Sequence, residues 1–398
     1  MYRTIPYRFN TLLVLAGLFA AGGCASQTAV APSKSFAFWP PFPDRPHVLY
    51  LASYSLNTDV EPPHGQLEDL IYGPQEKEKA MINHPYGVAV WKGCIYVCDT
   101  QSPLIEILDL RKHEMRLMGA VEAGKLAKPV AIAIAADGYK YVADDVVGCI
   151  AVFDANDRMV GQIGHEHFRP VCVAVRGNLL YATDYANNRI EVFDRTTGKS
   201  IQTIGGPGVK KGQVVGPLGV AVDNDGNIYL DDVVGCRVQK FSPAGKQIGQ
   251  FGGLGDLPGD FVRPKHIAID SEGKIYVVDA AFANVQIFDR QFRPLMYFGS
   301  AGAFPGAMEM PAGICIDEGD LDLFADRIPD AFQAERLIVV SNQFGDHKVS
   351  VYAEGHLKDG HDVAELSGSR GIVPSELNAS PARGAGAALS ATAGASAR

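Results

Sequence analysis

One acidic residue recurs through the middle of the chain. In five similar segments an Asp follows a Tyr by three positions, at Asp99, Asp144, Asp184, Asp232 and Asp279. Carboxylates gathered around one axis could bind a cation or transfer protons. However, a catalytic group is expected once or twice in a chain, whereas an Asp at a strand end accepts hydrogen bonds from the backbone of the turn that follows. The recurrence therefore favours a structural role for all five, and we predict no catalytic residue among them.

Two other groups could bind a metal. His165-Glu166-His167 offers zinc ligands, but it lies in a short connection with no third ligand evident, so we expect solvated side chains. The acidic stretch between Asp317 and Asp322 offers oxygen atoms for calcium, but its spacing differs from the Asp-x-Asp-x-Asp-Gly loop. It begins an insertion that extends to about Arg336 and that contains apolar residues able to form a short helix. We predict a solvated insertion and no metal site.

The cysteines give no sign of a cofactor or of a disulfide framework. After Cys24 the chain contains Cys94, Cys98, Cys149, Cys172, Cys236 and Cys315, mostly within apolar runs. Cys94 and Cys98 are separated by roughly 13 Å in an extended strand, which is too far for a disulfide. No haem-attachment or Cys-x-x-Cys motif is present. We expect buried free thiols and no cofactor.

A repeat of short strands positions the recurring Asp residues. Six prolines, 41 to 47 residues apart, each begin an alternating apolar run: Pro85, Pro129, Pro170, Pro217, Pro264 and Pro311. The strand that ends in Asp follows, and then come a third strand and a fourth that ends in an apolar residue and glycine. In the sixth copy, Ile338-Val339-Val340-Ser341 has lost both the Tyr and the Asp. Four short antiparallel strands in about 45 residues are typical of a propeller blade.

The sequence therefore predicts an all-β fold, a six-bladed β-propeller of four-stranded antiparallel blades over residues 47–356. The sixth copy stops after residues 348–352 without a fourth strand. Residues 48–53 resemble the fourth strand at residues 295–300. We therefore expect the N-terminal strand to complete blade six and close the ring, which removes unpaired sheet edges.

The repeats resemble a known family. The Pro-x-Gly-Val-Ala-Val starts, the Tyr-Val-x-Asp strands and residues 187–193 look like NHL repeats, and the resemblance covers roughly residues 82–355. The whole chain is similar to bacterial six-bladed propeller lipoproteins, a group that mostly lacks an assigned function. The resemblance thus implies a fold rather than a role.

Enzymes related to this family carry metal sites that can be sought here. Peptide-amidating lyases with NHL-like repeats bind zinc through histidines one residue after the repeat proline. The corresponding positions are Tyr86, Val130, Val171, Leu218, Lys265 and Ala312, none of them histidine. Lactonase-type propellers hold calcium through Glu, Asn and Asp, and the chain has no counterpart of their early Glu-Gly-Pro element. The resemblance therefore implies neither of these metal sites.

The N-terminus resembles an export signal. Arg3 and Arg8 precede an apolar stretch at residues 12–21 that is too short to span a bilayer. Small residues then lead to Cys24, as in the lipobox of bacterial lipoproteins. We predict a signal peptide at 1–23, lipidation at Cys24, a tether at 24–46 and a disordered Ala/Gly/Ser-rich tail at 357–398. The expected location is the outer membrane, facing the periplasm or the surface, and ordinary cleavage and release is the alternative.

The expected function is binding. A net charge of −9 disfavours nucleic-acid partners. The turns between second and third strands carry apolar residues where such repeats are usually polar: Val146, Val147, Tyr185, Val233, Val234 and Phe282. Gathered on one face, they would mark an interaction site for a protein or peptide, unless they fold inward over the channel mouth. We therefore predict a monomeric, non-enzymatic scaffold. The alternatives are a metal-dependent lyase or hydrolase acting in the central channel, and an accessory to extracellular electron-transfer or assembly machinery.

Overall fold

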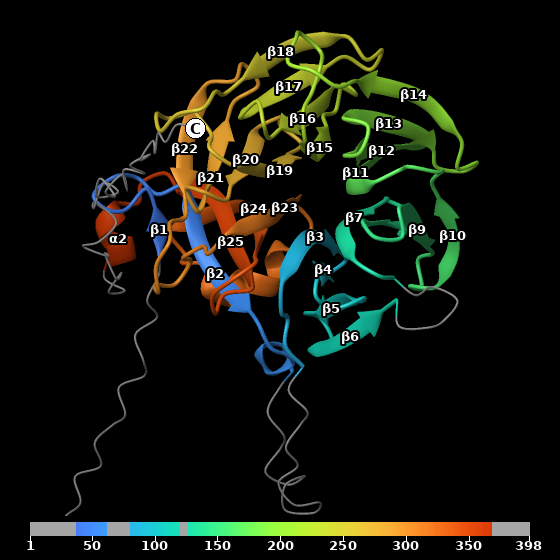
Figure 1. Ribbon diagram of the computed structural model, residues 1–398. Coiled ribbons are helices and arrows are strands. Elements are labelled where there is room, and N and C mark those ends of the chain that lie inside the picture. Colours follow the sequence, from blue (N-terminus) through green and yellow to red (C-terminus); the bar gives the residue numbers. More distant parts are fainter. Residues whose placement is uncertain (1–36, 62–79, 120–125, 368–398) are drawn as a thin grey trace, which may run out of the picture. The chain divides into compact units, whose positions relative to one another are not determined.

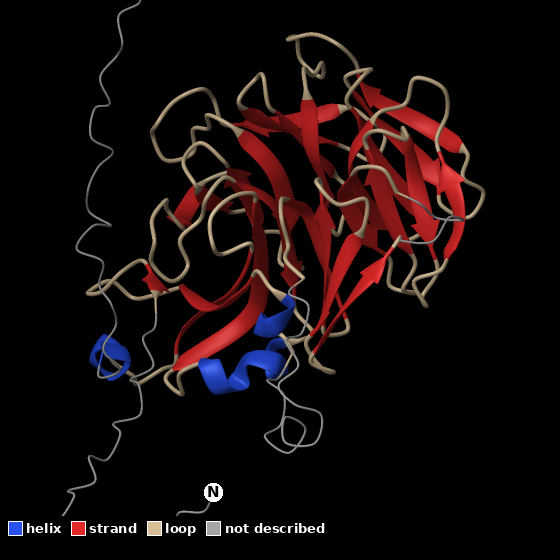
Figure 2. Ribbon diagram, turned by 60° about the horizontal axis from the view of Figure 1, so that its bottom comes forward, coloured by secondary structure: helices blue, strands red, loops and turns tan. Residues whose placement is uncertain are grey.

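The computed structural model describes residues 37–61, 80–119 and 126–367. Nearly all of their regular structure is β-strand, as Figure 2 shows. The predicted signal peptide at 1–23, the predicted lipidation site Cys24 and residues 368–398 of the predicted tail lie outside the described residues. Within the described ranges, no helix combines the length and the hydropathy needed to cross a bilayer.

Five of the six sheets are four-stranded, antiparallel and formed by strands that follow one another along the chain. Blade one comprises β3 (Pro85–Trp91), β4 (Cys94–Asp99), β5 (Ile105–Asp109) and β6 (Glu114–Met118). Blade two comprises β7 (Pro129–Ile134), β8 (Lys140–Asp144), β9 (Cys149–Phe153) and β10 (Met159–Ile163). Blade three comprises β11 (Pro170–Arg176), β12 (Leu179–Asp184), β13 (Arg189–Asp194) and β14 (Ser200–Gly205). Blade four comprises β15 (Pro217–Val222), β16 (Ile228–Asp232), β17 (Arg237–Phe241) and β18 (Gln247–Phe251). Blade five comprises β19 (Pro264–Ile269), β20 (Ile275–Asp279), β21 (Asn284–Phe288) and β22 (Pro294–Phe298).

The sixth sheet joins the two ends of the fold, as predicted. Its strands are β23 (Pro311–Asp317), β24 (Phe332–Asn342), β25 (Val349–Leu357), β2 (Val48–Tyr54) and β1 (Phe38–Trp39). The N-terminal β2 pairs antiparallel with the C-terminal β25, with Leu49 opposite Ala353 and Tyr50 opposite Tyr352. The ring is therefore closed by backbone hydrogen bonds between segments about 300 residues apart in the sequence.

The described fold extends beyond the predicted limits of 47 and 356. Strand β1 lies within residues 24–46, which were predicted to be a tether, and it makes this sheet five-stranded. Trp39 is buried and packs edge-on against Phe298 and Tyr352. At the other end, Leu357 and Leu366 are buried, and Leu366 lies in α2 (Val363–Ser367), within residues 357–398, which were predicted to be disordered. Burial of these apolar side chains favours order on both sides of the predicted propeller.

The register of blade six corrects the sequence alignment by one residue. In the other five blades the repeat proline lies opposite the terminal Asp of the second strand, for example Pro85 opposite Asp99. In blade six Pro311 lies opposite Asn342. Asn342 therefore occupies the Asp position and Val339 the Tyr position, whereas the sequence comparison placed Ser341 and Ile338 there. Strand β24 has no Tyr or Asp to fix the alignment, so the sequence alone left the register open.

The first strands of the six blades surround a central axis (Figure 1). Each contacts the first strand of the next blade, including β23 with β3 across the closure. The approach requires glycine, because a Cβ on Gly313 would overlap the carbonyl oxygen of Tyr86 in blade one. Turns between second and third strands and connections between blades emerge on one side, which we name the loop face. Turns between first and second strands emerge on the other side, which we name the turn face.

Candidate functional site

The five repeated Asp side chains are completely buried and hold the backbone of the loop face. Asp144 accepts hydrogen bonds from the backbone N–H groups of Ala127 (2.6 Å) and Lys128 (3.0 Å) in the preceding connection. It also accepts them from Val146 (3.0 Å) and Val147 (2.9 Å) in the following turn. Asp99, Asp184, Asp232 and Asp279 likewise bind the backbone of a connection between blades. These carboxylates are engaged by the fold and are not presented to a ligand.

The predicted apolar turn residues lie on the loop face with different exposures. Val146 and Val234 are each 67% exposed, and Val147 is 46% exposed. Tyr185 is 37% exposed, whereas Val233 and Phe282 are half-buried. Because Asp144 fixes the backbone of Val146 and Val147, these two side chains are held toward solvent by a rigid turn.

Contacts between blades two, three and four join several of these residues into one surface. The guanidinium of Arg169 lies 5.0 Å from the centre of the Tyr185 ring and binds Asp145 at 2.6 Å, next to Val146. Tyr185 and Val234 both lie beside Gly216, on the connection that enters blade four. Among the described residues, no hydrogen bond or ring contact links Phe282, in blade five, to the others.

The structure adds exposed apolar residues that the sequence analysis missed. They lie on the connections between blades and on the turn after β24, which share the loop face: Val209, Leu254, Leu257, Val262 and Phe344. Together with Val146, Val147, Tyr185 and Val234 they form what we name the apolar loop surface. A usable signal was present, since Val209 and Leu254 directly follow glycines in the glycine-rich connections between blades. The sequence analysis considered only the turns between second and third strands.

At the centre of the loop face the first strands form what we name the axial mouth. Lys265 follows Pro264 at the start of β19 and is only 8% exposed. Its ammonium group donates to the side-chain oxygen of Gln343 and lies 5.5 Å from the centre of the Tyr86 ring. Lys348 donates to the backbone oxygen of Gln343 at 3.3 Å. The side-chain nitrogen of Gln343 lies 3.5 Å from Nδ1 of His84.

Burial lowers the pKa values of two side chains at the axial mouth. It lowers the pKa of Lys265 to about 8, with a further contribution from the positive charge of Arg263. Burial likewise lowers the pKa of His84, although Asp99 opposes the shift. Among the described residues, no carboxylate forms an ion pair with Lys265, and its recorded partners are an amide and an aromatic ring. The sequence signal was that Lys265 is the one charged residue among the six positions that follow the repeat prolines.

Deeper along the axis, Cys172 and His266 are in contact across blades three and five. The thiol lies 3.3 Å from Nε2 of His266. Burial raises the pKa of Cys172 to about 12 and lowers that of His266 to about 4, so both groups are neutral near pH 7. A cysteine nucleophile acts as a thiolate. The surroundings of this pair therefore do not favour nucleophilic catalysis. All six described cysteines are free thiols.

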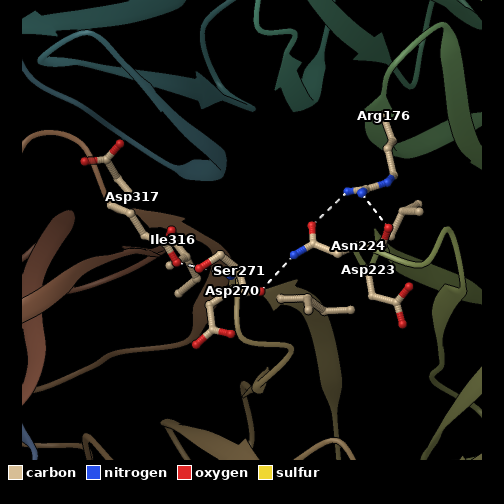
Figure 3. Close-up of a pocket in the computed structure, with 10 residues that line it drawn as sticks. Arg176, Asp223, Asn224, Asp270, Ser271, Ile316 and Asp317 are labelled. Carbon is tan, nitrogen blue, oxygen red and sulfur yellow. Dashed lines mark hydrogen bonds between the residues drawn. The ribbon is translucent and has the colours of Figure 1, made fainter.

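On the turn face, a cavity of about 280 Å³ lies between blades three, four, five and six. Figure 3 shows that a chain of hydrogen bonds crosses it from blade to blade. Arg176 donates to the side-chain oxygen of Asn224 at 3.2 Å, and Asn224 donates to the backbone oxygen of Ser271 at 2.8 Å. The backbone N–H of Ser271 donates to Glu318 at 3.1 Å. Four consecutive blades are thus linked around the lower end of the axis.

Two of the carboxylates that line this cavity, Asp223 and Asp270, are hydrogen-bonded to side chains outside it. Asp223 accepts from the hydroxyl of Tyr229 at 3.2 Å. Asp270 accepts from the hydroxyl of Tyr276 at 2.9 Å and from the buried guanidinium of Arg336 at 2.5 Å. These two carboxylates are therefore already engaged by the fold. The sequence analysis missed it, although Asp223, Asp270 and Asp317 recur six residues after a repeat proline.

The two groups of possible metal ligands, the His165–His167 segment and the acidic insertion of blade six, contact other protein groups or are exposed. Nε2 of His165 lies 2.9 Å from a carboxylate oxygen of Glu191, and His167 is exposed. Asp320 is buried, in contrast to the solvated insertion that was predicted, and accepts from the backbone of Gly93 at 2.6 Å and from Arg111 at 2.6 Å. In the described part of the chain, no three His, Cys, Asp or Glu side chains are grouped so that they could hold a metal ion.

Solved structures share the fold but not the sequence. A protein of unknown function from Bacteroides thetaiotaomicron is 15% identical over 76% of this chain and 75% of its own, with a TM-score of 0.55. A gluconolactonase from Xanthomonas campestris is 13% identical over 82% of this chain and 99% of its own, with a TM-score of 0.51. A virginiamycin B lyase from Staphylococcus aureus is 12% identical over 69% of this chain and 96% of its own, with a TM-score of 0.47.

The first two likenesses show the fold alone, because at such identities a propeller can carry unrelated activities. No protein-family model and no curated protein matches the sequence. The structure and these likenesses therefore confirm the six-bladed propeller that the repeats predicted. The NHL and lipoprotein assignments stay predictions.

Proposed function

We propose that this chain is a cell-envelope scaffold whose apolar loop surface docks an apolar segment of a partner protein. The observation that carries the proposal is the exposure of large apolar side chains from several blades on the same face, led by Val146, Val234 and Leu254. Large apolar patches on a soluble domain are characteristic of interaction sites. A closed ring of sheets holds such loops in fixed positions and reduces the entropy lost on binding.

The proposal includes export and a lipid anchor at Cys24. It is supported by the basic start, the short apolar stretch and the small residues before that cysteine. Such an anchor would hold the propeller at the membrane.

Affinity capture from an envelope extract tests the docking surface. The triple variant Val146→Ser/Val147→Ser/Val234→Ser should recover the partner at least tenfold less than wild type, because it removes the most exposed apolar side chains of the turns between second and third strands. Its melting temperature should stay within a few degrees of wild type, since surface substitutions change stability by about 0.5 kcal/mol or less each.

The matched control is Leu117→Ser/Ile201→Ser/Ile248→Ser, which removes three exposed apolar side chains from fourth strands. The control should recover the same protein as wild type. Equal recovery by the loop-face variant, or equal loss in both variants, would show that the apolar loop surface is not the docking site.

A lyase or hydrolase acting in the channel is the competing hypothesis from the sequence. Elemental analysis of the purified full chain separates the two, because stoichiometric zinc or calcium would favour the enzyme.

A further inference from the structure

The axial mouth gathers positive charge on an acidic chain. The whole chain carries a formal net charge of −9. Lys265 and Arg263 come from the start of blade five, and Lys348 comes from the turn before β25 in blade six. Within the described residues, Lys265 donates to the side-chain oxygen of Gln343 and Lys348 donates to its backbone oxygen. The guanidinium of Arg263 lies 3.9 Å from the sulfur of Met310. In the part of the chain that the structure describes, no carboxylate lies at ion-pair distance from any of the three.

Lys265 is the most informative of the three because it is buried. An ammonium group taken out of water is unfavourable unless a negative charge or several hydrogen bonds compensate it. Here the compensation comes from one amide oxygen and from the face of the Tyr86 ring. A site of this kind lacks a counter-ion of its own.

The groups around Lys265 are held in place by further hydrogen bonds. The backbone N–H of Gln343 donates to the carbonyl of Met310 at 3.2 Å. His84 is fixed by a 2.8 Å contact between Nδ1 and the hydroxyl of Thr100, and its ring packs edge-on against Phe344, with 5.2 Å between ring centres. The mouth is thus formed before any ligand arrives, which lowers the cost of binding.

We propose that the axial mouth binds the carboxylate group of a small organic ligand, with Lys265 and Arg263 as its cationic contacts. A guanidinium presents paired N–H donors that match the two oxygens of a carboxylate. Tyr86 and Phe344 offer aromatic surface for the organic part of the ligand. Inorganic phosphate has no organic part to pack on this aromatic surface, so it should bind more weakly than an aromatic carboxylate. The site goes beyond the proposed docking function and does not require a protein partner.

Ligand binding at this site should depend on pH. The pKa of Lys265 is lowered to about 8 in the free protein, by burial and by Arg263. A bound carboxylate would favour the ammonium form and raise that pKa again. The charged or titratable groups that face Lys265 are Arg263, Tyr86, His84 and Lys348. Affinity should therefore be highest below pH 8 and fall by up to about tenfold per pH unit above it.

The test uses the full chain and N-acetyl-phenylalanine as the probe. Binding is measured by isothermal titration calorimetry, and access to Lys265 by its rate of arylation with fluorodinitrobenzene, followed by peptide mass spectrometry. The probe should bind and slow arylation of Lys265, whereas N-acetyl-phenylalaninamide, which lacks the carboxylate, should bind at least tenfold more weakly. Lys265→Met should lose at least tenfold in affinity, and Lys199→Met, at an exposed lysine, should bind as wild type does.

Three results would overturn the proposal. They are equal binding of the acid and the amide, stronger protection of Lys265 by inorganic phosphate than by the acid, and no protection by either the acid or acetate. If Lys265→Met does not fold, Arg263→Gln serves instead, at an exposed position, and should weaken the acid severalfold. The Val146→Ser/Val147→Ser/Val234→Ser variant should bind the probe normally, so that failure of this site and failure of the docking surface can be told apart.

Discussion

In blades three and six, the side chain just before the last residue of the second strand links neighbouring blades. In blade three the hydroxyl of Thr183 donates to the backbone oxygen of Leu218 at 3.0 Å, and in blade six that of Ser341 donates to the backbone oxygen of Tyr86. Asp231 occupies this position in blade four, where it is completely buried and neither carboxylate oxygen has a hydrogen-bond partner. Burial raises its pKa well above the ordinary value, with a contribution from Asp279. A protonated Asp231 could donate to the next blade as the two hydroxyls do.

The titration of Asp231 should therefore make the protein less stable as pH rises. The folded state retains a proton that the unfolded chain releases near pH 4, so stability falls from that pH up to the raised pKa of the folded state. Asp231→Asn removes the titration and supplies an N–H donor. It should raise the free energy of unfolding at pH 7 by about 2 kcal/mol.

Urea unfolding between pH 5 and 8 measures this effect. The wild type should lose stability across the range relative to Asp231→Asn, while Asp225→Asn, at an exposed position, should follow the wild type. A less stable Asp231→Asn with an unchanged pH dependence would contradict the assignment.

At the scale of elements, the insertion in blade six is anchored to blade one by side-chain contacts. Its helix η3 (Leu321–Arg327) buries Phe324, and Asp320 just before it binds Gly93 and Arg111 of blade one. Asp322 binds the same Arg111 at 3.0 Å but is 64% exposed. The two carboxylates thus share a cation and differ in burial.

This pair predicts unequal costs of substitution. Asp320→Ala leaves the N–H of Gly93 without its acceptor and should lower the free energy of unfolding by about 2–3 kcal/mol. Asp322→Ala removes an exposed ion pair and should cost about 0.5 kcal/mol or less. Chemical denaturation of both variants measures the difference. Equal losses of free energy of unfolding would show that Asp320 does not anchor the insertion to blade one.

Sequence reasoning predicted these elements where the repeat carries its own markers. Proline, Tyr and Asp recur in five blades, so the strand order followed from their spacing. Closure by residues 48–53 followed from their likeness to the fourth strand at residues 295–300. Blade six lacks Tyr and Asp, and its register was displaced by one residue. Strand β1 was missed because its two residues are held by packing of Trp39 against Phe298 and Tyr352, which no local pattern reveals.

The candidate sites were less predictable than the elements. Turn residues such as Val146 could be assigned to a face, but exposure depends on neighbouring blades. Among the described residues, Lys265 has no carboxylate partner because blades one and six place neutral groups around its ammonium. The ion pair of Asp270 likewise depends on Arg336, 66 residues away. These facts require the three-dimensional arrangement.

At the scale of the whole molecule, closure of the ring supports every blade. Residues 37–54 supply β1 and β2, and β2 covers the edge of β25. Removing them would leave a long apolar edge unpaired, and such edges promote aggregation. A chain that begins at residue 55 should form oligomers and lose its cooperative unfolding transition. A chain that begins at residue 37 should remain monomeric and unfold as the full chain does.

Light scattering after size-exclusion chromatography, together with thermal unfolding, compares the two truncations. A monomeric and cooperatively folded chain from residue 55 onward would show that the N-terminal strands are dispensable to the ring.

The central functional claim is that a partner docks on the loop face. Site-specific photo-crosslinking tests it most directly, with a photoreactive amino acid placed at Val146, at Val234 or at Ser271 on the opposite face. Positions 146 and 234 should crosslink to the same protein, and position 271 should not. Crosslinking to a protein from position 271 alone, or to lipid rather than protein from positions 146 and 234, would contradict it.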